Sequence, residues 1–461
     1  MKKALVCSLA LAAAAVSGAE PDAEGFVTIF NGKDLSGWIG ATDTYRVEDG
    51  GVLACCPPDG GNGKRGNGGN LVTEKQYENF ILRFEFCMPT NANNGLGIRM
   101  PSPEAHGAYE AMCELQILDD GGDKYEKLKP YQFHGSLYGI APSRRDNIGK
   151  QIWGKEKNFA GRGSFLKKAG LWNFEEVRVI GSRIQVILNG VMITDADVSK
   201  FKGDGDTPDG KKHPGLHRKI GHVGWLGHGH HVQWRNIRIK EVAADYVVGS
   251  DTYRPAPAGF TTLFNGRNLE NWKGVTREER FDNPLIRRAA TPEKRAEMQK
   301  IADAGMIEHW TIRDGALFFD GFKGGYSLAT VKDYGDFEMW VDWRIMSVTG
   351  DSGLYLRGCP QVQIWDAHNQ WHIGSGGLYN NKKNPSSALS IQDRLVGSWN
   401  RFHITMRGER VTVELNGVKV VDDTVLENYW DRTKPIFPAE QIELQCHGDP
   451  IEFKNIFIRE L

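Results

Sequence analysis

The sequence lacks an excess of charge of either sign. Lysines and arginines number 57 among 461 residues, against 58 aspartates and glutamates, and the formal net charge is −1. Nucleic-acid binding depends on a clustered basic surface, so this balance argues against a nucleic-acid partner. After the N-terminal segment, no apolar run approaches the length of about 18 residues that crosses a membrane. We therefore expect no membrane anchor.

The sequence also lacks the short motifs of several enzyme classes. HExxH, a Walker loop and GxSxG are absent, which argues against zincins, P-loop enzymes and typical serine hydrolases. The glycine-rich stretch at 61–66 fits the dinucleotide-binding pattern, but a strand-like segment follows it where that fold requires a helix. We interpret it as a hairpin loop and expect no nucleotide cofactor.

Cysteine is scarce. The chain has seven cysteines and no CxxC pair, so structural zinc and thioredoxin-like chemistry have no support. Cys7 lies in the N-terminal apolar run, and the six others allow too many pairings for any disulfide to be assigned.

The N-terminus has the pattern of an export signal. Lys2 and Lys3 precede an apolar run at 4–16, and small residues follow at 17–19. We predict a signal peptide over 1–19 and an exported bacterial protein, periplasmic or secreted.

What the sequence has in excess is glycine, at 55 residues, together with 19 prolines. Their usual combined share is about 12%, so the excess indicates many tight turns and short strands. A chain of this length is too long for one comfortable core, which predicts two domains.

An internal repeat supports this division. Landmarks of the first half return in the same order in the second half. The pairs are 26–38 with 260–272, 114–119 with 361–366, 135–138 with 376–379, 172–173 with 399–400, 188–190 with 415–417, 228–229 with 447–448, and 235–237 with 454–456. We predict domains at 20–241 and 260–461, a linker at 242–259, and a helical insertion near 274–309 that starts at Pro292 and stops at Gly305.

Strand patterns dominate both halves. The segments 80–86 and 337–343 alternate or run apolar, 176–180 and 184–188 form a hairpin pattern, and Asn-Gly turns follow at 189–190 and 416–417. The fold class is predicted as all-β, with two antiparallel sandwiches in tandem.

One group of polar residues suggests chemistry. The period of a strand places Glu114 and Gln116 on one face, and Asp119 follows where the strand curls toward a loop. With Arg99, these carboxylates can act as a general base and a charge stabiliser. The alternative is an ordinary salt bridge on the strand face.

Histidines gather at His222, His228, His230 and His231. Strand alternation would place His228 and His230 together as a pair of metal ligands. The alternative is an exposed strand end, since the second half keeps only His447.

These landmarks resemble a known family. The series Phe-x-x-Leu/Ile-Phe-Asn-Gly-x-x-Leu-x-x-Trp, Ser/Asn-Gly-x-x-x-Arg, Glu-x-Gln-Ile-x-Asp, Gly-x-Leu-Tyr, Trp-Asn, Leu-Asn-Gly, and His-Gly with Arg-Asn-Ile is similar to the 3-keto-disaccharide hydrolase domain family. The resemblance covers nearly the whole mature chain as two tandem copies. It implies concanavalin-like jelly-roll sandwiches, related in shape to laminarinase-type glycosidases, and activity on glycosides oxidised at C3.

A ketone at C3 acidifies the hydrogen at C2, so cleavage can proceed by proton removal, elimination of the aglycone and hydration. Under this resemblance, the expected catalytic residues are Glu114, Asp119, Arg99 and His134. Gln116 and Tyr138 would shape the pocket, and a divalent metal ion is an alternative to Arg99 for stabilising the enolate. The substrate also implies a partner oxidoreductase that makes the 3-keto sugar.

The two copies differ at one position of this set, where Gln361 replaces Glu114. We therefore expect the first copy to catalyse and the second to bind substrate or act weakly. The expected binding residues of the second copy are Arg357, Gln363, Trp365, Asp366, His368 and Tyr379. The rival hypothesis is a lectin-like protein that binds carbohydrate without cleaving it.

Overall fold

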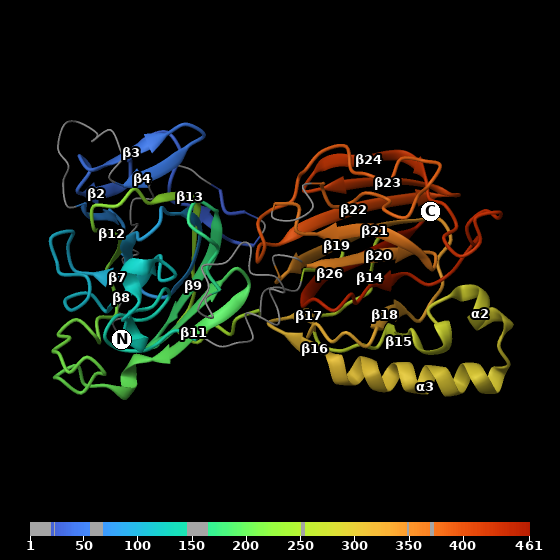
Figure 1. The fold of residues 1–461 in the computed structure, drawn as a ribbon, viewed down its shortest axis with the longest axis horizontal. Coiled ribbons are helices and arrows are strands. Elements are labelled where there is room, and N and C mark those ends of the chain that lie inside the picture. The colour runs from blue at the N-terminus through green and yellow to red at the C-terminus, as the bar shows by residue number, and fades with distance from the viewer. Residues whose placement is uncertain are drawn as a thin grey trace, which may run out of the picture.

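The structure is a computed structural model in which two similar β-sandwiches lie side by side along the long axis of the molecule (Figure 1). It describes residues 20–22, 24–55, 68–144, 165–249, 254–347, 350–368 and 373–461. The expected signal peptide at 1–19 and the glycine-rich loop at 61–66 lie outside the described residues. Among those described, no helix has both the length and the apolar character needed to cross a membrane.

The larger sheet of the first copy has eight antiparallel strands. Its order is β11-β10-β9-β6-β13-β4-β3, and β1 pairs with β13 beside this path. Asn189 and Gly190 join β10 to β11 with φ angles of 49° and 87°, as the predicted Asn-Gly turn requires. The strands are Val27–Thr28 (β1), Tyr45–Glu48 (β3), Val52–Cys55 (β4), Phe80–Cys87 (β6), Asn173–Ile180 (β9), Arg183–Leu188 (β10), Val191–Asp197 (β11) and Gln233–Glu241 (β13).

The smaller sheet of the first copy has five strands in the order β2-β5-β12-β7-β8. They are Trp38–Gly40 (β2), Gly69–Thr73 (β5), Asn93–Met100 (β7), Cys113–Leu118 (β8) and His222–Gly227 (β12). The described residues of this copy also form the short 3-10 turns Asp123–Tyr125 (η1), Pro130–Gln132 (η2) and Val198–Lys200 (η4).

The second copy repeats both sheets strand for strand. Its larger sheet has the order β16-β17-β26-β19-β22-β23-β24 with β14 beside β26, and its smaller sheet has the order β15-β18-β25-β20-β21. The strands are Thr261–Thr262 (β14), Trp272–Thr276 (β15), Trp310–Arg313 (β16), Ala316–Phe319 (β17), Tyr326–Thr330 (β18), Phe337–Ile345 (β19), Asp351–Leu356 (β20), Cys359–Trp365 (β21), Asn400–Arg407 (β22), Arg410–Leu415 (β23), Val418–Val425 (β24), Glu443–Leu444 (β25) and Ile451–Glu460 (β26).

Each sandwich closes over an aromatic core, and the predicted all-β fold class is confirmed. In the first copy, Trp225 from the smaller sheet stacks on Trp234 from the larger one, with ring centroids 4.6 Å apart. Both side chains are fully buried, so the pair joins the two layers of the sandwich. The five cysteines among the described residues are buried; they are Cys55, Cys87, Cys113, Cys359 and Cys446.

The insertion of the second copy contains η5 (Glu278–Arg280), α2 (Pro284–Ala289) and α3 (Pro292–His309). The Thr291 hydroxyl caps α3 by accepting from the Lys294 amide at 3.2 Å, so the predicted start is confirmed. The predicted stop at Gly305 is wrong. Gly305 lies inside α3. A Cβ there would come within 2.4 Å of the Tyr326 ring, so this position needs glycine for packing.

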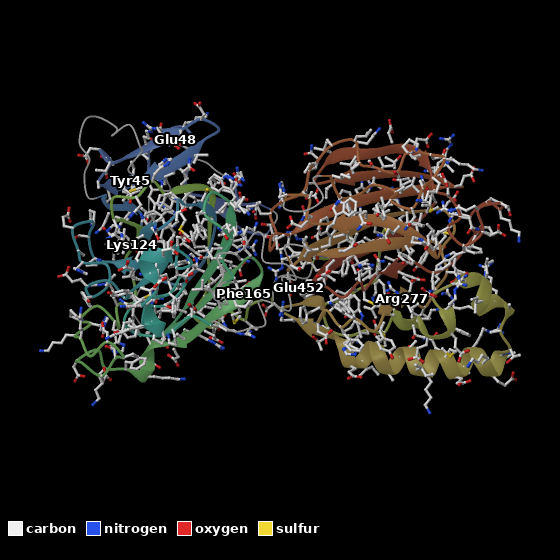
Figure 2. The ribbon with its side chains drawn as sticks, in the orientation of Figure 1. Tyr45, Glu48, Lys124, Phe165, Arg277 and Glu452 are labelled. Carbon is white, nitrogen blue, oxygen red and sulfur yellow. The ribbon has the colours of Figure 1, made fainter. Side chains whose placement is uncertain are left out.

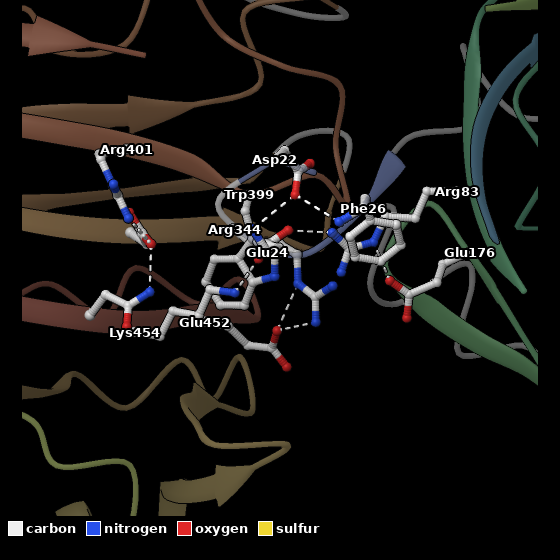
Figure 3. A network of polar contacts seen from close by, with 12 residues as sticks. Asp22, Glu24, Phe26, Arg83, Glu176, Arg344, Trp399, Arg401, Glu452 and Lys454 are labelled. Atoms are coloured by element: carbon white, nitrogen blue, oxygen red, sulfur yellow. Dashed lines mark hydrogen bonds and ion pairs between the residues drawn. The ribbon is translucent and has the colours of Figure 1, made fainter. Parts of the chain in front are cut away.

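Charged side chains join the two copies, as Figure 3 shows. Glu24 of the first copy pairs with Arg83 of the same copy and with Lys454 of the second, where Nζ and Oε1 are 2.5 Å apart. Arg178 and Asp314 form another pair between the copies at 3.2 Å. Burial lowers the pKa of the Lys454 ammonium, and the Glu24 carboxylate opposes this by favouring its charged form.

Candidate functional site

The outward face of the smaller sheet in the first copy carries Glu114, on edge strand β8. Cys113, Leu115 and Ile117 belong to the core, so Glu114 points away from it. A Cβ at Gly95 on the neighbouring strand would lie only 2.3 Å from Glu114 Oε1. Only glycine therefore leaves room for this carboxylate, which is 7% exposed.

A histidine lies beside this carboxylate. His228 follows β12, its Nε2 is 3.8 Å from Glu114 Oε1, and its side chain is 47% exposed. The pair can therefore be reached from solvent. Two residues on, His230 Nδ1 accepts from the Asn93 amide at 3.3 Å, and burial together with nearby cations lowers the pKa of His230.

The pair has the elements of an acid–base site. A carboxylate can remove a proton from a substrate carbon, and a neighbouring imidazole can donate a proton to a leaving oxygen. Across the residues that the structure describes, no group of three or more histidines, cysteines, aspartates or glutamates is arranged to hold a metal ion.

Gln116 and Tyr138 lie on the same side of the sheet as Glu114. The Gln116 amide donates to the Gln132 carbonyl oxygen over a long 3.5 Å, and Gln132 donates to the Tyr138 hydroxyl at the same distance. The Tyr138 amide donates to the Glu114 carbonyl oxygen at 2.9 Å. The chain after η2 therefore extends the sheet beyond β8 and brings these three predicted residues together.

Arg99 is directed elsewhere. Its Nε donates to the Glu78 carbonyl oxygen at 2.7 Å, and its Nη1 donates to the carbonyl oxygens of Gly181 at 3.0 Å and Arg218 at 3.2 Å. A guanidinium occupied by backbone groups of three separate loops holds those loops together. The structure does not bring it to Glu114.

Asp119 and His134 also have structural partners. Asp119 accepts from the Asn91 amide at 2.7 Å and so fastens the turn before β7. His134 is buried between the sheets, where its Nδ1 accepts from the Leu118 amide at 3.2 Å and its Nε2 lies 2.9 Å from a Glu175 oxygen. Burial raises the pKa of the Asp119 carboxyl, but neither side chain joins the Glu114 site.

The equivalent face of the second copy has a different polar set. Gln361 and Gln363 take the places of Glu114 and Gln116 on β21. The Gln363 amide donates to Asp351 Oδ1 at 2.7 Å, and His447 Nδ1 is 3.5 Å from Asp351 Oδ2. Asp351 was not among the predicted residues.

Three further polar side chains on this face escaped prediction. Glu443 is fully buried on β25, Gln445 follows it, and Tyr355 lies opposite Glu443 on β20. Gln445 Nε2 donates to the Tyr355 hydroxyl at 3.3 Å. Spacing by two along each strand places them on one face, but only strand pairing shows that these strands are neighbours. Arg277, labelled in Figure 2, donates to the Cys446 carbonyl oxygen at 3.3 Å at the same edge.

The other predicted residues of the second copy have contacts of their own. Arg357 donates to the Gly335 carbonyl oxygen at 2.7 Å, in the same way that Arg99 donates to the Glu78 carbonyl oxygen in the first copy. His368 Nε2 lies 2.7 Å from the Asp393 carbonyl oxygen, and its amide donates to Asp366 at 3.2 Å. Trp365 meets the exposed Tyr379 edge to face, with centroids 5.3 Å apart. These contacts stabilise the loop after β21.

Glu443 should make stability depend on pH. Burial raises its pKa from 4.5 to about 7, against the opposing effect of Arg287, while Asp282 and Glu440 add to the rise. As pH rises, the Glu443 carboxyl loses its proton at about pH 4.5 in the unfolded chain but only at about pH 7 in the folded chain. Its contribution to the free energy of unfolding is therefore fully present below pH 4.5 and is lost as pH rises through about 7. One pKa unit corresponds to about 1.4 kcal/mol, which predicts a loss of about 3 kcal/mol.

Glu443→Gln should remove this dependence. Urea unfolding at pH 4.5 and at pH 8 would measure it, with Gln441→Leu as a matched control that removes the amide partner of Glu443 but keeps its carboxyl. An equal loss of stability with pH in the wild type and in Glu443→Gln would contradict the assignment.

The fold defines a protein of two antiparallel β-sandwiches in tandem, and comparison with known proteins specifies the family. The 3-keto-alpha-glucoside-1,2-lyase-like domain matches residues 25–240 and again 259–459. The chain therefore belongs to this family, with two copies of its domain. Membership supports a glycoside-cleaving enzyme.

Individual relatives are more distant. The 3-keto-disaccharide hydrolase of Bacteroides thetaiotaomicron is 26% identical over 246 residues, which cover 48% of this chain and 79% of that protein. A solved structure from Parabacteroides distasonis is 26% identical, with a TM-score of 0.37, over 47% of this chain and 99% of its own. The carbohydrate-binding module CBM66 from Bacillus subtilis is 11% identical, with a TM-score of 0.27, over 44% of this chain and 96% of its own.

Proposed function

We propose that this chain cleaves the glycosidic bond of 3-keto-glycosides, including 3-keto-disaccharides, by elimination followed by hydration. The observation that carries the proposal is the Glu114–His228 pair, at 3.8 Å, on the outward face of the sheet in a member of this family. The reaction needs a base that removes a proton from the sugar and an acid that protonates the leaving oxygen, and this pair supplies one group for each.

In the proposed reaction, the Glu114 carboxylate removes the C2 proton of the sugar, which is acidic because C3 is a ketone. The enolate then collapses, C3 becomes a ketone again, a C1–C2 double bond forms, and the aglycone leaves from C1. The His228 imidazolium gives its proton to the leaving oxygen. Water then adds to C1 and gives a proton back to the His228 imidazole, C2 regains a proton from the Glu114 carboxylic acid, and hydrolysis is the net result.

Gln116 is placed to assist. Its Nε2 makes only a long contact at 3.5 Å with the Gln132 carbonyl oxygen, so it can donate to the C3 oxygen as negative charge develops there. Tyr138, whose amide donates to the Glu114 carbonyl oxygen, would orient a sugar hydroxyl. We further propose that the mature chain acts after export from a bacterial cell, on sugars that a separate oxidoreductase has oxidised at C3.

A time course in deuterated water tests the reaction. The purified chain is mixed with a 3-keto-disaccharide and followed by proton NMR. We expect release of the free 3-keto sugar with deuterium at C2, because the abstracted proton exchanges with solvent before it returns. Release without deuterium would favour direct hydrolysis, and sugar line broadening without release would favour a lectin-like protein.

A further inference from the structure

The two copies share a histidine–carboxylate pair, although the sequence repeat suggests that the second has lost its carboxylate. In the first copy the pair is His228 with Glu114, at 3.8 Å. In the second it is His447 with Asp351, at 3.5 Å. Leu226 pairs with Gly95, and Gln445 pairs with Gly353. His228 and His447 each come two residues later, so they occupy equivalent positions.

The acid and an amide have exchanged strands between the copies. Gln116 lies opposite Gly95, and Gln363 lies opposite Gly353 in the same register. In this frame Asp351 corresponds to Asn93, and Gln361 corresponds to Glu114. The edge strand carries the acid in the first copy and the amide in the second, and the neighbouring strand has the opposite arrangement.

The backbone amides at the two equivalent positions, 93 and 351, each donate to a side chain at the same distance. His230 accepts from the Asn93 amide at 3.3 Å, and Asp449 accepts from the Asp351 amide at 3.3 Å. Gln363 holds the Asp351 carboxylate at 2.7 Å. The side chains of His447 and Asp351 are 45% and 25% exposed, so solvent and ligands can reach them.

An unsatisfied acceptor lies on the same face. Gln445 is 4% exposed, and within the described part of the chain its Oε1 has no hydrogen-bond donor. A Cβ at Gly353 would lie 3.2 Å from this atom, which places it over the strand that carries Asp351. Buried polar atoms normally have a partner, and a sugar hydroxyl is a donor of the required kind.

We infer that the second copy holds a second active centre for 3-keto-glycosides, in which Asp351 and His447 take the roles of Glu114 and His228. The inference rests on the proposed function for its substrate. The Asp351 carboxylate removes the C2 proton, the enolate electrons form the C1–C2 double bond as the aglycone leaves, and the His447 imidazolium protonates the leaving oxygen. Water then adds to C1 and gives a proton back to the His447 imidazole, and the Asp351 carboxylic acid returns a proton to C2.

Burial raises the pKa of the Asp351 carboxyl, which makes its carboxylate a stronger base than an exposed aspartate. The base of the second copy lies on the next strand and also four residues along it, because Glu114 pairs with Gly97 whereas Asp351 corresponds to Asn93. The two centres therefore approach the sugar from different positions, and we expect different KM values for one substrate.

Four forms of the full chain test this inference by their turnover of a 3-keto-disaccharide. These are the wild type, Glu114→Gln, Asp351→Asn and the double variant. Asp422→Asn, an exposed residue of the second copy paired with Lys419, is the matched control. We expect Glu114→Gln to keep measurable turnover, with a changed KM, and the added Asp351→Asn to lower that remainder about 100-fold or more.

His447→Gln in the Glu114→Gln background should have the same effect as Asp351→Asn, and thermal unfolding of every form would show that each is folded. Complete loss of turnover in Glu114→Gln, or equal turnover in Glu114→Gln and the double variant, would overturn the second centre but leave the proposed function standing. An inactive wild type would overturn the proposed function itself.

Discussion

In a chain whose second copy carries Asp351→Asn, replacing Glu114 with glutamine is expected to lower kcat for a 3-keto-disaccharide by about 10²- to 10⁴-fold, the usual contribution of a general base. The substitution preserves shape and hydrogen bonding but removes the ability to accept a proton. KM should change little if Glu114 acts on the C2 proton and makes few contacts with the bound sugar. Steady-state kinetics measures both constants.

Gly95 offers an independent test of the same position. Alanine at 95 would place a methyl group 2.3 Å from Glu114 Oε1, so Gly95→Ala should displace the carboxylate while leaving its chemistry intact. We expect a smaller loss of kcat than in Glu114→Gln. The matched control is Gly50→Ala, whose Cβ would meet no atom within 4 Å, although its backbone is strained for alanine. Unchanged kcat in both Glu114→Gln and Gly95→Ala, each made in the Asp351→Asn background, would exclude Glu114 as the base.

The sequence was sufficient to predict the repeat, the fold class and most strands, because these depend on local patterns. Side-chain alternation placed Glu114 and Gln116 on one face, and the Asn-Gly turn at 189–190 follows from backbone preferences of those two residue types. The end of α3 could not be predicted in this way. Glycine often marks the end of a helix, but Gly305 lies inside α3, where it makes room for Tyr326 of a strand distant in sequence.

The roles of Arg99, Asp119 and His134 were not accessible from spacing. Each satisfies backbone or buried groups that come close only in the folded chain, such as the Gly181 carbonyl oxygen for Arg99 and Glu175 for His134. A polar residue near a candidate site in sequence can therefore serve the scaffold.

Strand pairing also changes the interpretation of the second copy. Aligned motifs show Gln361 in place of Glu114, which predicts a lost carboxylate. The connection between the paired strands is long in the first copy, at 101–112, and only 357–358 in the second. Asp351 is therefore recognised as the partner of His447 only when β20 and β21 are placed side by side.

The largest expected effect on stability concerns the side of the second copy that faces the first. Glu452 is fully buried on β26, where one oxygen pairs with Arg344 and the other with Arg313. These guanidiniums lower the pKa of its carboxyl against the effect of burial. Glu452→Ala should cost about 3–5 kcal/mol of unfolding free energy, because it leaves a buried charge without its partner.

Arg344 is the residue that makes this loss large. Its side chain is only 8% exposed, and its guanidinium lies 4.8 Å from the Trp399 ring. Glu460, near the end of the same strand, pairs with Lys332 while both side chains are more than half exposed. Glu460→Ala should therefore cost at most about 1 kcal/mol. Urea unfolding measures the loss of unfolding free energy in both variants. Equal losses in Glu452→Ala and Glu460→Ala would show that Arg344 finds solvent or another partner when Glu452 is removed.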